Sequence, residues 1–300
     1  MNNNDDINLK SPATASSSPR PMSKTPMYTA MHSSRYERQD VIKAIDQAEG
    51  THLICYVGGT NTQINRDDII GLVDLLHNVP EGKPVDLLLH TCGGDVDACE
   101  KLVGLIHAKV IDSPFRVIIP DLAKSAGTLL ALGANSILMS DTSEMGMIDP
   151  QFQMRDNQGN EIWHSVIAYL DAYAEHATAL AKDPKNPIAL VMLHNFDAKV
   201  VHKFKGIRDR VRTFAEDLLK RQGLPASSIS SELMSSSRWK THGQPITHAS
   251  ATHLGLPIEY LPTTDERWMR YWKLYCLQRL QIEDDKKIFE SAFVSQVFGN

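Results

Sequence analysis

Cysteine is scarce in this 300-residue chain, and its pattern excludes two classes of site. The four cysteines are Cys55, Cys92, Cys99 and Cys276. They form no CxxC pair and no HExxH motif occurs, so we predict neither a zinc site nor a disulfide scaffold.

No apolar run reaches the roughly 20 residues that span a bilayer. Residues 1–10 lack the basic-then-apolar order of a signal peptide. We expect a soluble, cytoplasmic protein with reduced thiols and no stable membrane insertion.

A surplus of basic charge is also lacking. The chain has 36 acidic and 31 basic side chains, which gives a formal net charge of −5 at pH 7. Proteins that bind a phosphate backbone need clustered Lys and Arg, so we do not expect nucleic acid as a partner.

Two common catalytic motifs are absent. Gly82-Lys83 is followed by Pro84 instead of Ser or Thr, so no nucleotide-binding loop is encoded. Ala123 stands where the GxSxG elbow of α/β-hydrolases requires glycine.

Short apolar segments alternate with helical patterns through the first half of the chain. Residues 52–57, 85–90, 115–120 and 136–139 are expected strands. Helical spacing follows the first of these at Ile69, Ile70, Val73 and Leu76, and the second at Cys99, Leu102, Val103 and Ile106. The alternation predicts parallel βαβ units in an α/β fold.

The ends of the chain differ from this pattern. Residues 1–25 are rich in Asn, Asp, Ser and Pro, which predicts a disordered tail, and a short helix is expected over 37–48. Beyond residue 160 the spacing looks helical. An aromatic stripe in the last of these helices could pack on the core or on another subunit; it consists of Trp268, Tyr271, Trp272 and Tyr275.

The first segment with chemical potential is Thr91-Cys92-Gly93-Gly94-Asp95, between an expected strand and a helix. Glycines let backbone N–H groups approach a ligand, and a helix N-terminus adds partial positive charge. An oxyanion hole requires these properties. A tight strand-to-helix turn would explain the same glycines.

The second segment is Ala123-Lys124-Ser125-Ala126-Gly127, which opens a helix that is apolar on nearly all sides and so must be buried. A serine there faces the crevice at the carboxyl ends of the strands, where open α/β sheets bind ligands. A helix-capping serine is the structural alternative.

The third segment, residues 146–151, follows the fourth strand and contains Asp149-Pro150. An aspartate before proline suits a turn. In a functional site Asp149 would orient a catalytic partner or belong to a substrate loop.

Together these segments, with residues 239–247 (WKTHGQPIT) and 251–256 (ATHLGL), resemble the serine dehydrogenase proteinase (SDH proteinase) family of the ClpP/crotonase superfold. The chain is also similar to signal-peptide-peptidase-A-like serine peptidases. The resemblance covers roughly residues 50–260. It implies a β-spiral of parallel βαβ units with flanking helices, oligomerisation through the C-terminal helices, and no cofactor.

The resemblance also implies a division of the chain and a set of roles. Residues 26–262 would form the peptidase domain and residues 263–300 a helical C-terminal extension. Ser125 would attack a carbonyl, and the oxyanion hole would comprise Gly93, Gly94 and Ala126, with the N–H groups of Gly93 and Ala126 facing the oxyanion.

A serine nucleophile needs a base that accepts its proton. The identity of the base for Ser125 stays open. This chain has Asp149 where ClpP-type enzymes carry a histidine. The stretch 161–170, comparable to the one that supplies a lysine in the signal-peptide-peptidase type, contains His164 but no lysine.

Three side chains are candidates for this base. Lys124 adjoins the serine but is better explained as a solvated lysine at the rim of the site. His164 lies near where a related base would enter. His242 fits equally well as a base or as a loop histidine that hydrogen-bonds a carbonyl.

Three functions are compatible with these patterns. The leading one is an ATP-independent serine endopeptidase that acts on polypeptides as a homo-oligomer. A crotonase-like enzyme would use the same oxyanion hole on an acyl thioester. A catalytically degenerate oligomeric scaffold would keep the fold without the chemistry.

Overall fold

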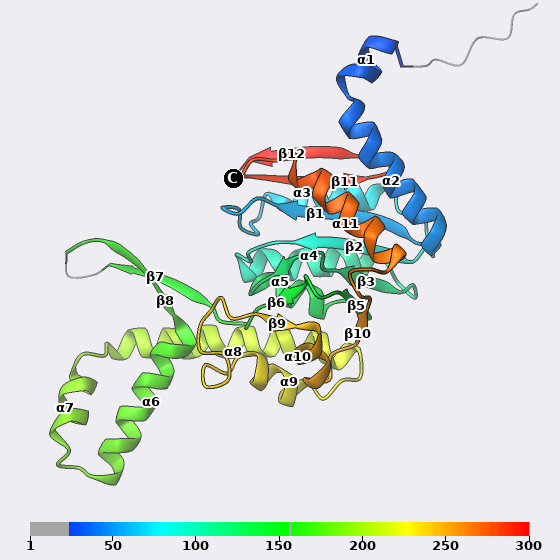
Figure 1. Cartoon of the computed structure of the whole chain (residues 1–300). Helices are drawn as coiled ribbons and strands as arrows, with labels where there is room; N and C mark the ends of the chain where they lie inside the picture. The colour runs from blue at the N-terminus through cyan, green and yellow to red at the C-terminus, as the bar shows by residue number, and fades with distance from the viewer. Residues whose placement is uncertain (1–23, 156–157, 300) are drawn as a thin grey trace, which may run out of the picture.

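The computed structural model describes residues 24–155 and 158–299, and a seven-stranded sheet forms its centre (Figure 1). The strand order is β10-β5-β3-β2-β1-β11-β12. Five neighbouring strands run parallel: β1 (His52–Gly58), β2 (Val85–His90), β3 (Phe115–Ile118), β5 (Ser136–Met139) and β10 (Ile258–Tyr260). Every residue of β1 and β2 is buried, as expected for parallel strands covered on both faces. The predicted parallel α/β core is confirmed.

Helices cover the two faces of this sheet unequally. On one face lie α2 (Ser33–Glu49) and α11 (Glu266–Arg279), whose apolar side chains pack on β1. The larger core on the other face is formed by α3 (Asp68–His77), α4 (Val96–Lys109), α5 (Ala126–Leu132), α8 (Ala198–Arg221), α9 (Ala226–Leu233) and α10 (His248–His253). A short helix, α1 (Pro26–Met31), precedes α2.

Two smaller sheets accompany the central one in the described part of the chain. One contains β4 (Leu122–Ala123), β6 (Glu144–Met145) and β9 (Ile246–Thr247). The other is the hairpin of β7 (Gln151–Arg155) and β8 (Glu161–Ser165). The sequence analysis missed these strands because each is short and none contains a continuous apolar run of four residues.

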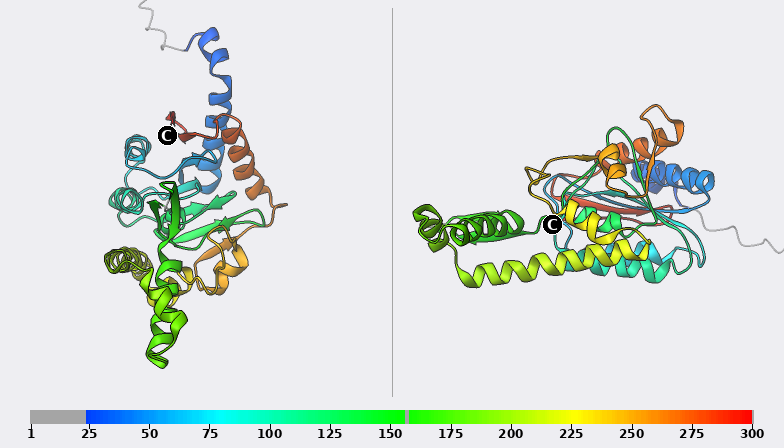
Figure 2. Two further views of the ribbon diagram at one scale, coloured as in Figure 1. Left: turned by 90° about the vertical axis from the view of Figure 1, so that its left-hand side faces the viewer. Right: turned by 90° about the horizontal axis from the view of Figure 1, so that it is seen from below.

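The hairpin, α6 (Val166–Lys182), α7 (Pro187–His194) and the first half of α8 form an arm that extends away from the sheet (Figures 1 and 2). Its small core includes Val166, Leu170, Val201 and Phe204. The apolar side chains of α7 are mostly exposed, which distinguishes this helix from those on the central sheet.

The C-terminal segment corrects a prediction. Residues 263–300 were expected to be a helical extension, but only α11 is a helix. It is followed by β11 (Lys286–Ser291), which pairs antiparallel with β1, and by β12 (Ser295–Gly299). Trp268 and Tyr271 are buried in the core, so α11 packs on its own sheet. The tail predicted for residues 1–25 lies, up to residue 23, outside the described residues.

Two helix predictions also need adjustment. The helix expected over 37–48 is α2 and begins earlier, at Ser33. In α3 the predicted apolar face is rotated, because Ile70 and Val73 are exposed while Leu72 and Leu75 are buried. No helix in the described ranges is long and apolar enough to cross a membrane.

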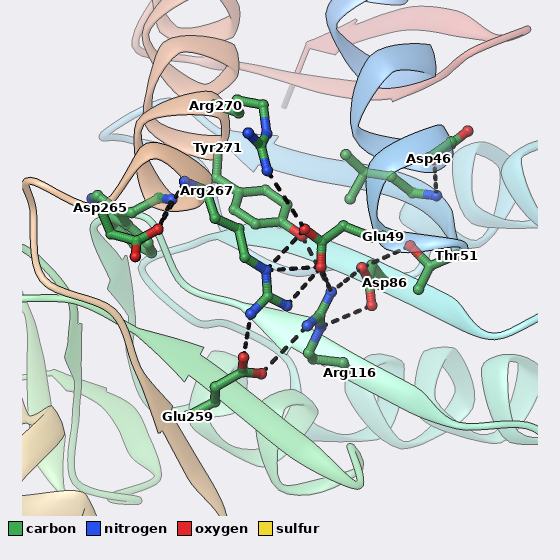
Figure 3. Close-up of polar contacts among 12 residues, drawn as sticks. Asp46, Glu49, Thr51, Asp86, Arg116, Glu259, Asp265, Arg267, Arg270 and Tyr271 are labelled. Carbon is green, nitrogen blue, oxygen red and sulfur yellow. Dashed lines mark hydrogen bonds and ion pairs between the residues drawn. The ribbon is translucent and has the colours of Figure 1, made fainter.

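A charged network ties the helices α2 and α11 to the sheet (Figure 3). Arg116 of β3 lies 2.5 Å from Asp86 of β2 and 3.1 Å from Glu49 at the end of α2. Arg267 of α11 contacts Glu49 at 2.6 Å and also pairs with Glu259. Burial alone would raise the pKa of Glu49, but the hydrogen bonds from Arg267 and Arg116 outweigh it and lower that pKa. With Arg270, which lies 3.9 Å from Glu49, the network has three arginines and three carboxylates, so it is balanced in charge and has a structural role.

Candidate active site

The loop from β2 to α4 is shaped by two glycines. Ile64 bonds to both neighbours of Gly94: its N–H donates to the Gly93 carbonyl at 2.7 Å, and its carbonyl accepts from Asp95 N–H at 2.9 Å. A Cβ on Gly94 would stand 2.4 Å from the Ile64 carbonyl oxygen, so only glycine fits there. Among the described residues, the Gly94 N–H has no hydrogen-bond acceptor.

Gly93 differs from its predicted role. Its N–H donates to Thr91 Oγ1 at 3.1 Å, so this N–H is engaged within the loop and does not face an oxyanion. A Cβ on Gly93 would stand 3.0 Å from Ser125 Cβ and 2.7 Å from the Lys124 carbonyl oxygen. Gly93 therefore permits close packing of the loop against the serine.

Ser125 has an unusual backbone conformation, with φ 49° and ψ −111°. Within residues 24–155 and 158–299 only Asp112 is a second non-glycine residue with positive φ. Such conformations cost on the order of 1–3 kcal/mol and gather at functional sites. The Ser125 side chain makes no capping hydrogen bond with the described part of α5, so it does not act as the helix cap that was the structural alternative.

The neighbours of Ser125 are held firmly. Thr128 Oγ1 lies within hydrogen-bond distance of the Ala123 and Gly146 carbonyl oxygens, at 2.9 and 2.8 Å, and accepts from Gly146 N–H at 3.2 Å. It thereby ties the serine loop to the segment before Asp149. Ala126 is the first residue of α5, and its N–H finds no acceptor in the described part of the chain. This N–H and that of Gly94 are therefore available to a ligand.

Lys124 was predicted to be solvated, and this is wrong. The residue is only 9% exposed. Its Nζ lies 2.8 Å from Glu144 Oε1 and donates to the carbonyls of Met145 at 3.2 Å and Gly243 at 3.4 Å. The ammonium group is thus used to join β4, β6 and the loop before β9.

Ser125 and His242 line one pocket of about 710 Å³, although they are 117 positions apart in the sequence. His242 is brought there by the loop before β9. The remaining lining residues are Gln63, Cys92, Gly94, Asp95, Val96, Asp97, Pro150, Gln151, Trp163, Ile207, Arg210 and Val211.

Asp149 lies behind His242 and is only 2% exposed. Its Oδ1 accepts from Ser165 Oγ at 2.8 Å and from Ile167 N–H at 3.3 Å. Its Oδ2 accepts from Gln151 Nε2 at 2.7 Å and lies 3.5 Å from His242 Nδ1. These donors are the partners that a buried carboxylate requires. Of the predicted residues, the fold gathers Ser125, His242 and Asp149.

His164 does not join them. It lies on β8, opposite Phe152 of β7, and is not one of the residues that line the pocket. Successive side chains of a strand point to opposite faces. Its neighbour Trp163 lines the pocket instead. Trp163 and Gln151 were not named as site residues from the sequence, because only the pairing of β7 with β8 places them there.

The cysteines and histidines nearby show no sign of a metal site. No group of three or more His, Cys, Asp or Glu side chains in the described ranges could hold a metal ion. Cys92 lines the pocket, and burial raises the pKa of its thiol. Cys55 and Cys99 are buried, as predicted.

The family profile of ClpP-like SDH-type serine proteinases matches residues 26–278. The chain belongs to this family. The predicted family and its ClpP-like α/β fold are thereby confirmed.

Curated relatives have no described activity. Uncharacterized protein MJ0137 of Methanocaldococcus jannaschii is 28% identical over 197 residues, which are 65% of this chain and 60% of the relative. Uncharacterized protein MJ1495 of the same organism is 24% identical over 233 residues, 74% of this chain and 71% of the relative. The chain thus matches less than two thirds of the length of the first relative.

The solved structures that match this chain include a stomatin-specific protease and ClpP1. A mutant of the 1510-N membrane-bound stomatin-specific protease is 18% identical, with a TM-score of 0.45, over 73% of this chain and 83% of that one. ClpP1 from Listeria monocytogenes is 16% identical, with a TM-score of 0.37, over 73% of this chain and 95% of that one.

Proposed function

We propose that this protein is a serine peptidase in which Ser125 attacks the carbonyl carbon of a peptide bond and forms an acyl-enzyme, which water then hydrolyses. The observation that carries the proposal is the strained Ser125 backbone at the edge of a pocket that His242 also lines. Membership of a serine proteinase family supports the same chemistry.

His242 is the proposed base. A serine hydroxyl is activated when a neighbouring base accepts its proton, and the base in turn needs a group that orients it. Asp149 is buried behind the imidazole, with Oδ2 3.5 Å from Nδ1, and is the proposed orienting carboxylate. In this arrangement the aspartate takes the orienting role that the sequence suggested for it, and Lys124 takes none in proton transfer.

The proposed oxyanion hole consists of the N–H groups of Gly94 and Ala126. Gly94 lies in the loop that packs against Ser125, and Ala126 begins α5 directly after Ser125; neither N–H has an acceptor in the residues that the structure describes. Backbone donors that are fixed before the reaction stabilise developing negative charge without having to reorganise. This assignment replaces Gly93, whose N–H is bonded to Thr91.

The proposed substrate is a loosely structured polypeptide, bound without ATP. The pocket has an apolar wall of Val96, Ile207, Val211 and Trp163, which suits an apolar substrate side chain. We also propose a homo-oligomer. Because α11 packs on its own sheet, the contact surface we propose is the exposed face of α7, with Ile188 71% and Val191 65% exposed.

Labelling with a fluorophosphonate probe, together with cleavage of an unfolded casein, tests the proposal. We expect stoichiometric labelling of Ser125 in the full chain and no labelling of Ser125→Ala. His242→Gln should label at least about 100-fold more slowly, because removal of a general base typically costs that factor. His248→Gln is the matched control, since His248 stacks on Tyr260 outside the pocket and should label normally.

Other results would favour the other functions. An absence of labelling together with tight binding of coenzyme A would point to a crotonase-like enzyme. An absence of both, in a folded protein, would point to a scaffold.

A further inference from the structure

A side-chain amide stands between the two groups that the proposed mechanism needs in contact. Gln151 Nε2 lies 2.7 Å from Asp149 Oδ2 and 3.3 Å from His242 Nδ1. The direct separation of Nδ1 and Oδ2 is 3.5 Å. This exceeds the usual 2.7–3.2 Å range for an N–H···O hydrogen bond. Gln151 therefore occupies the place of the expected histidine–aspartate hydrogen bond.

The chemistry of Asp149 fixes which end of the amide faces it. The carboxylate already accepts two hydrogen bonds at Oδ1, from Ser165 and from Ile167 N–H. An atom 2.7 Å from its other oxygen must be a donor, because the amide carbonyl would be repelled there. The NH₂ end thus points toward both Asp149 and the imidazole.

This orientation favours one tautomer of His242. An N–H that points at Nδ1 requires Nδ1 to be an acceptor, so the single proton of the neutral ring is on Nε2. A base that removes the Ser125 proton needs a free lone pair, and with Nδ1 turned to Gln151 and Asp149 only Nε2 is left for the serine. The present arrangement blocks that lone pair with a proton.

We propose that Gln151 holds the active site in a resting state and that catalysis requires its amide to withdraw. This inference rests on the proposed function. Withdrawal lets Nδ1–H donate to Asp149 Oδ2 and leaves Nε2 unprotonated. The Nε2 proton passes to water and Nδ1 gains a proton from water, so the net charge is unchanged. Gln151 is a positioning residue that acts through His242.

The place of Gln151 suggests what draws the amide away. It is the first residue of β7 and lines the pocket together with Ser125. A polypeptide in that pocket brings backbone carbonyls that compete for the amide N–H groups. The occupant that activates the site is therefore the extended substrate itself.

Nitrogen-15 NMR of the histidine side chains tests the inference directly, with the His242 signal assigned from its loss in His242→Gln. We expect the Nε2–H tautomer in the wild type and the Nδ1–H tautomer in Gln151→Met, which cannot donate. Gln153→Met is the matched control: Gln153 lies on the same strand but bonds to Glu161, and it should leave the wild-type tautomer in place. An Nδ1–H tautomer in the wild type, or no change in Gln151→Met, overturns the inference.

A kinetic measurement separates this inference from the proposed function. Labelling of Ser125 by a fluorophosphonate should be several-fold faster in Gln151→Met, because a larger fraction of molecules is competent. Equal or slower labelling contradicts the inference. If no variant is labelled while the tautomer changes as expected, the peptidase proposal fails and the role of Gln151 stands. If Gln151→Met does not fold, the same two measurements on Gln151→Leu, together with the His242 tautomer of the wild type, test the inference.

Discussion

Lys124 Nζ lies 2.8 Å from Glu144 Oε1, and the two side chains are 11% and 31% exposed. The residue that adjoins the nucleophile in sequence is therefore a structural tie between β4 and β6. Partly buried ion pairs of this kind leave an uncompensated charge when one partner is removed. Lys124→Met should lower the free energy of unfolding by about 2 kcal/mol, allowing for the partial exposure of Glu144.

A double-mutant cycle with Glu144→Gln checks the assignment. Urea unfolding of both single variants and the double variant should show a coupling of roughly 1–2 kcal/mol. The double variant should still react at Ser125 with a fluorophosphonate. Complete loss of labelling in a folded double variant would instead make Lys124 the base.

The strain at Ser125 predicts a trade-off between stability and activity. Ser125→Gly should raise the free energy of unfolding by about 1 kcal/mol, because relief of the strained φ and ψ exceeds the entropy that glycine loses on folding. The same variant cannot be labelled. Asp112→Gly, at the other positive φ of 61°, should leave labelling intact. Lower stability of Ser125→Gly in urea unfolding would show that the serine conformation is not strained.

The sequence predicted the parts of the fold that depend on long apolar runs. The strands β1, β2, β3 and β5 and the buried helix α5 follow from such runs, and so does the position of Ser125 at a strand-to-helix junction. The segment β11 was missed because Lys287 and Glu290 interrupt its apolar pattern. Both are buried and paired, with Asp68 and Arg38, respectively, and no local pattern reveals partners more than 200 residues away.

The candidate site was predicted only in part for a similar reason. Ser125 and the glycine loop are local signals, whereas the choice among Lys124, His164 and His242 depends on which loop reaches the pocket. Our proposal passes over Lys124 because its ammonium group is paired with Glu144. It passes over His164 because the alternation of side chains along β8 brings Trp163 to the pocket instead. Gln151 gained meaning only from its distances to Asp149 and His242.

We expect acid to lower the stability of the fold through the titration of His90. It is buried at the end of β2, and burial lowers its pKa from 6.5 to about 4, against the opposing attraction of Asp121. Between these values the unfolded state binds the proton and the folded state does not. Stability should therefore fall as the pH decreases from about 6.5 to 4, by up to roughly 3 kcal/mol from this group.

Urea unfolding at pH 7 and pH 5 measures this slope. His90→Gln should lose less stability on acidification than the wild type, whereas His248→Gln should behave like the wild type. Asp46 contributes a slope of opposite sign, since burial raises its pKa to about 6, so the difference between variants is the quantity to compare. Equal slopes in His90→Gln and the wild type would contradict the prediction.

The exposed face of α7 predicts how the proposed oligomer forms. Ile188→Asp combined with Val191→Asp places two charges on this face, and burying them in an interface would be strongly unfavourable. We expect this variant to sediment as a monomer in analytical ultracentrifugation, with an unchanged circular dichroism spectrum. Leu280→Asp is the control, because Leu280 is 86% exposed at the end of α11, away from the arm. Sedimentation of the α7 variant as the wild-type oligomer would exclude this contact.

Trp163 predicts how the pocket recognises substrate. It is 59% exposed, yet it lines the pocket with Ile207 and Val211, so it offers apolar area that a bound side chain would cover. Trp163→Ala should raise KM for an unstructured peptide by about tenfold with little change in kcat, because contact made equally in the ground and transition states affects binding alone. Ile162→Ala is the matched control: Ile162 is 43% exposed on the opposite face of the same strand, and its loss should leave KM unchanged. If both variants raised KM equally, the effect would come from the hairpin as a whole and the pocket would not be the binding site for the substrate side chain.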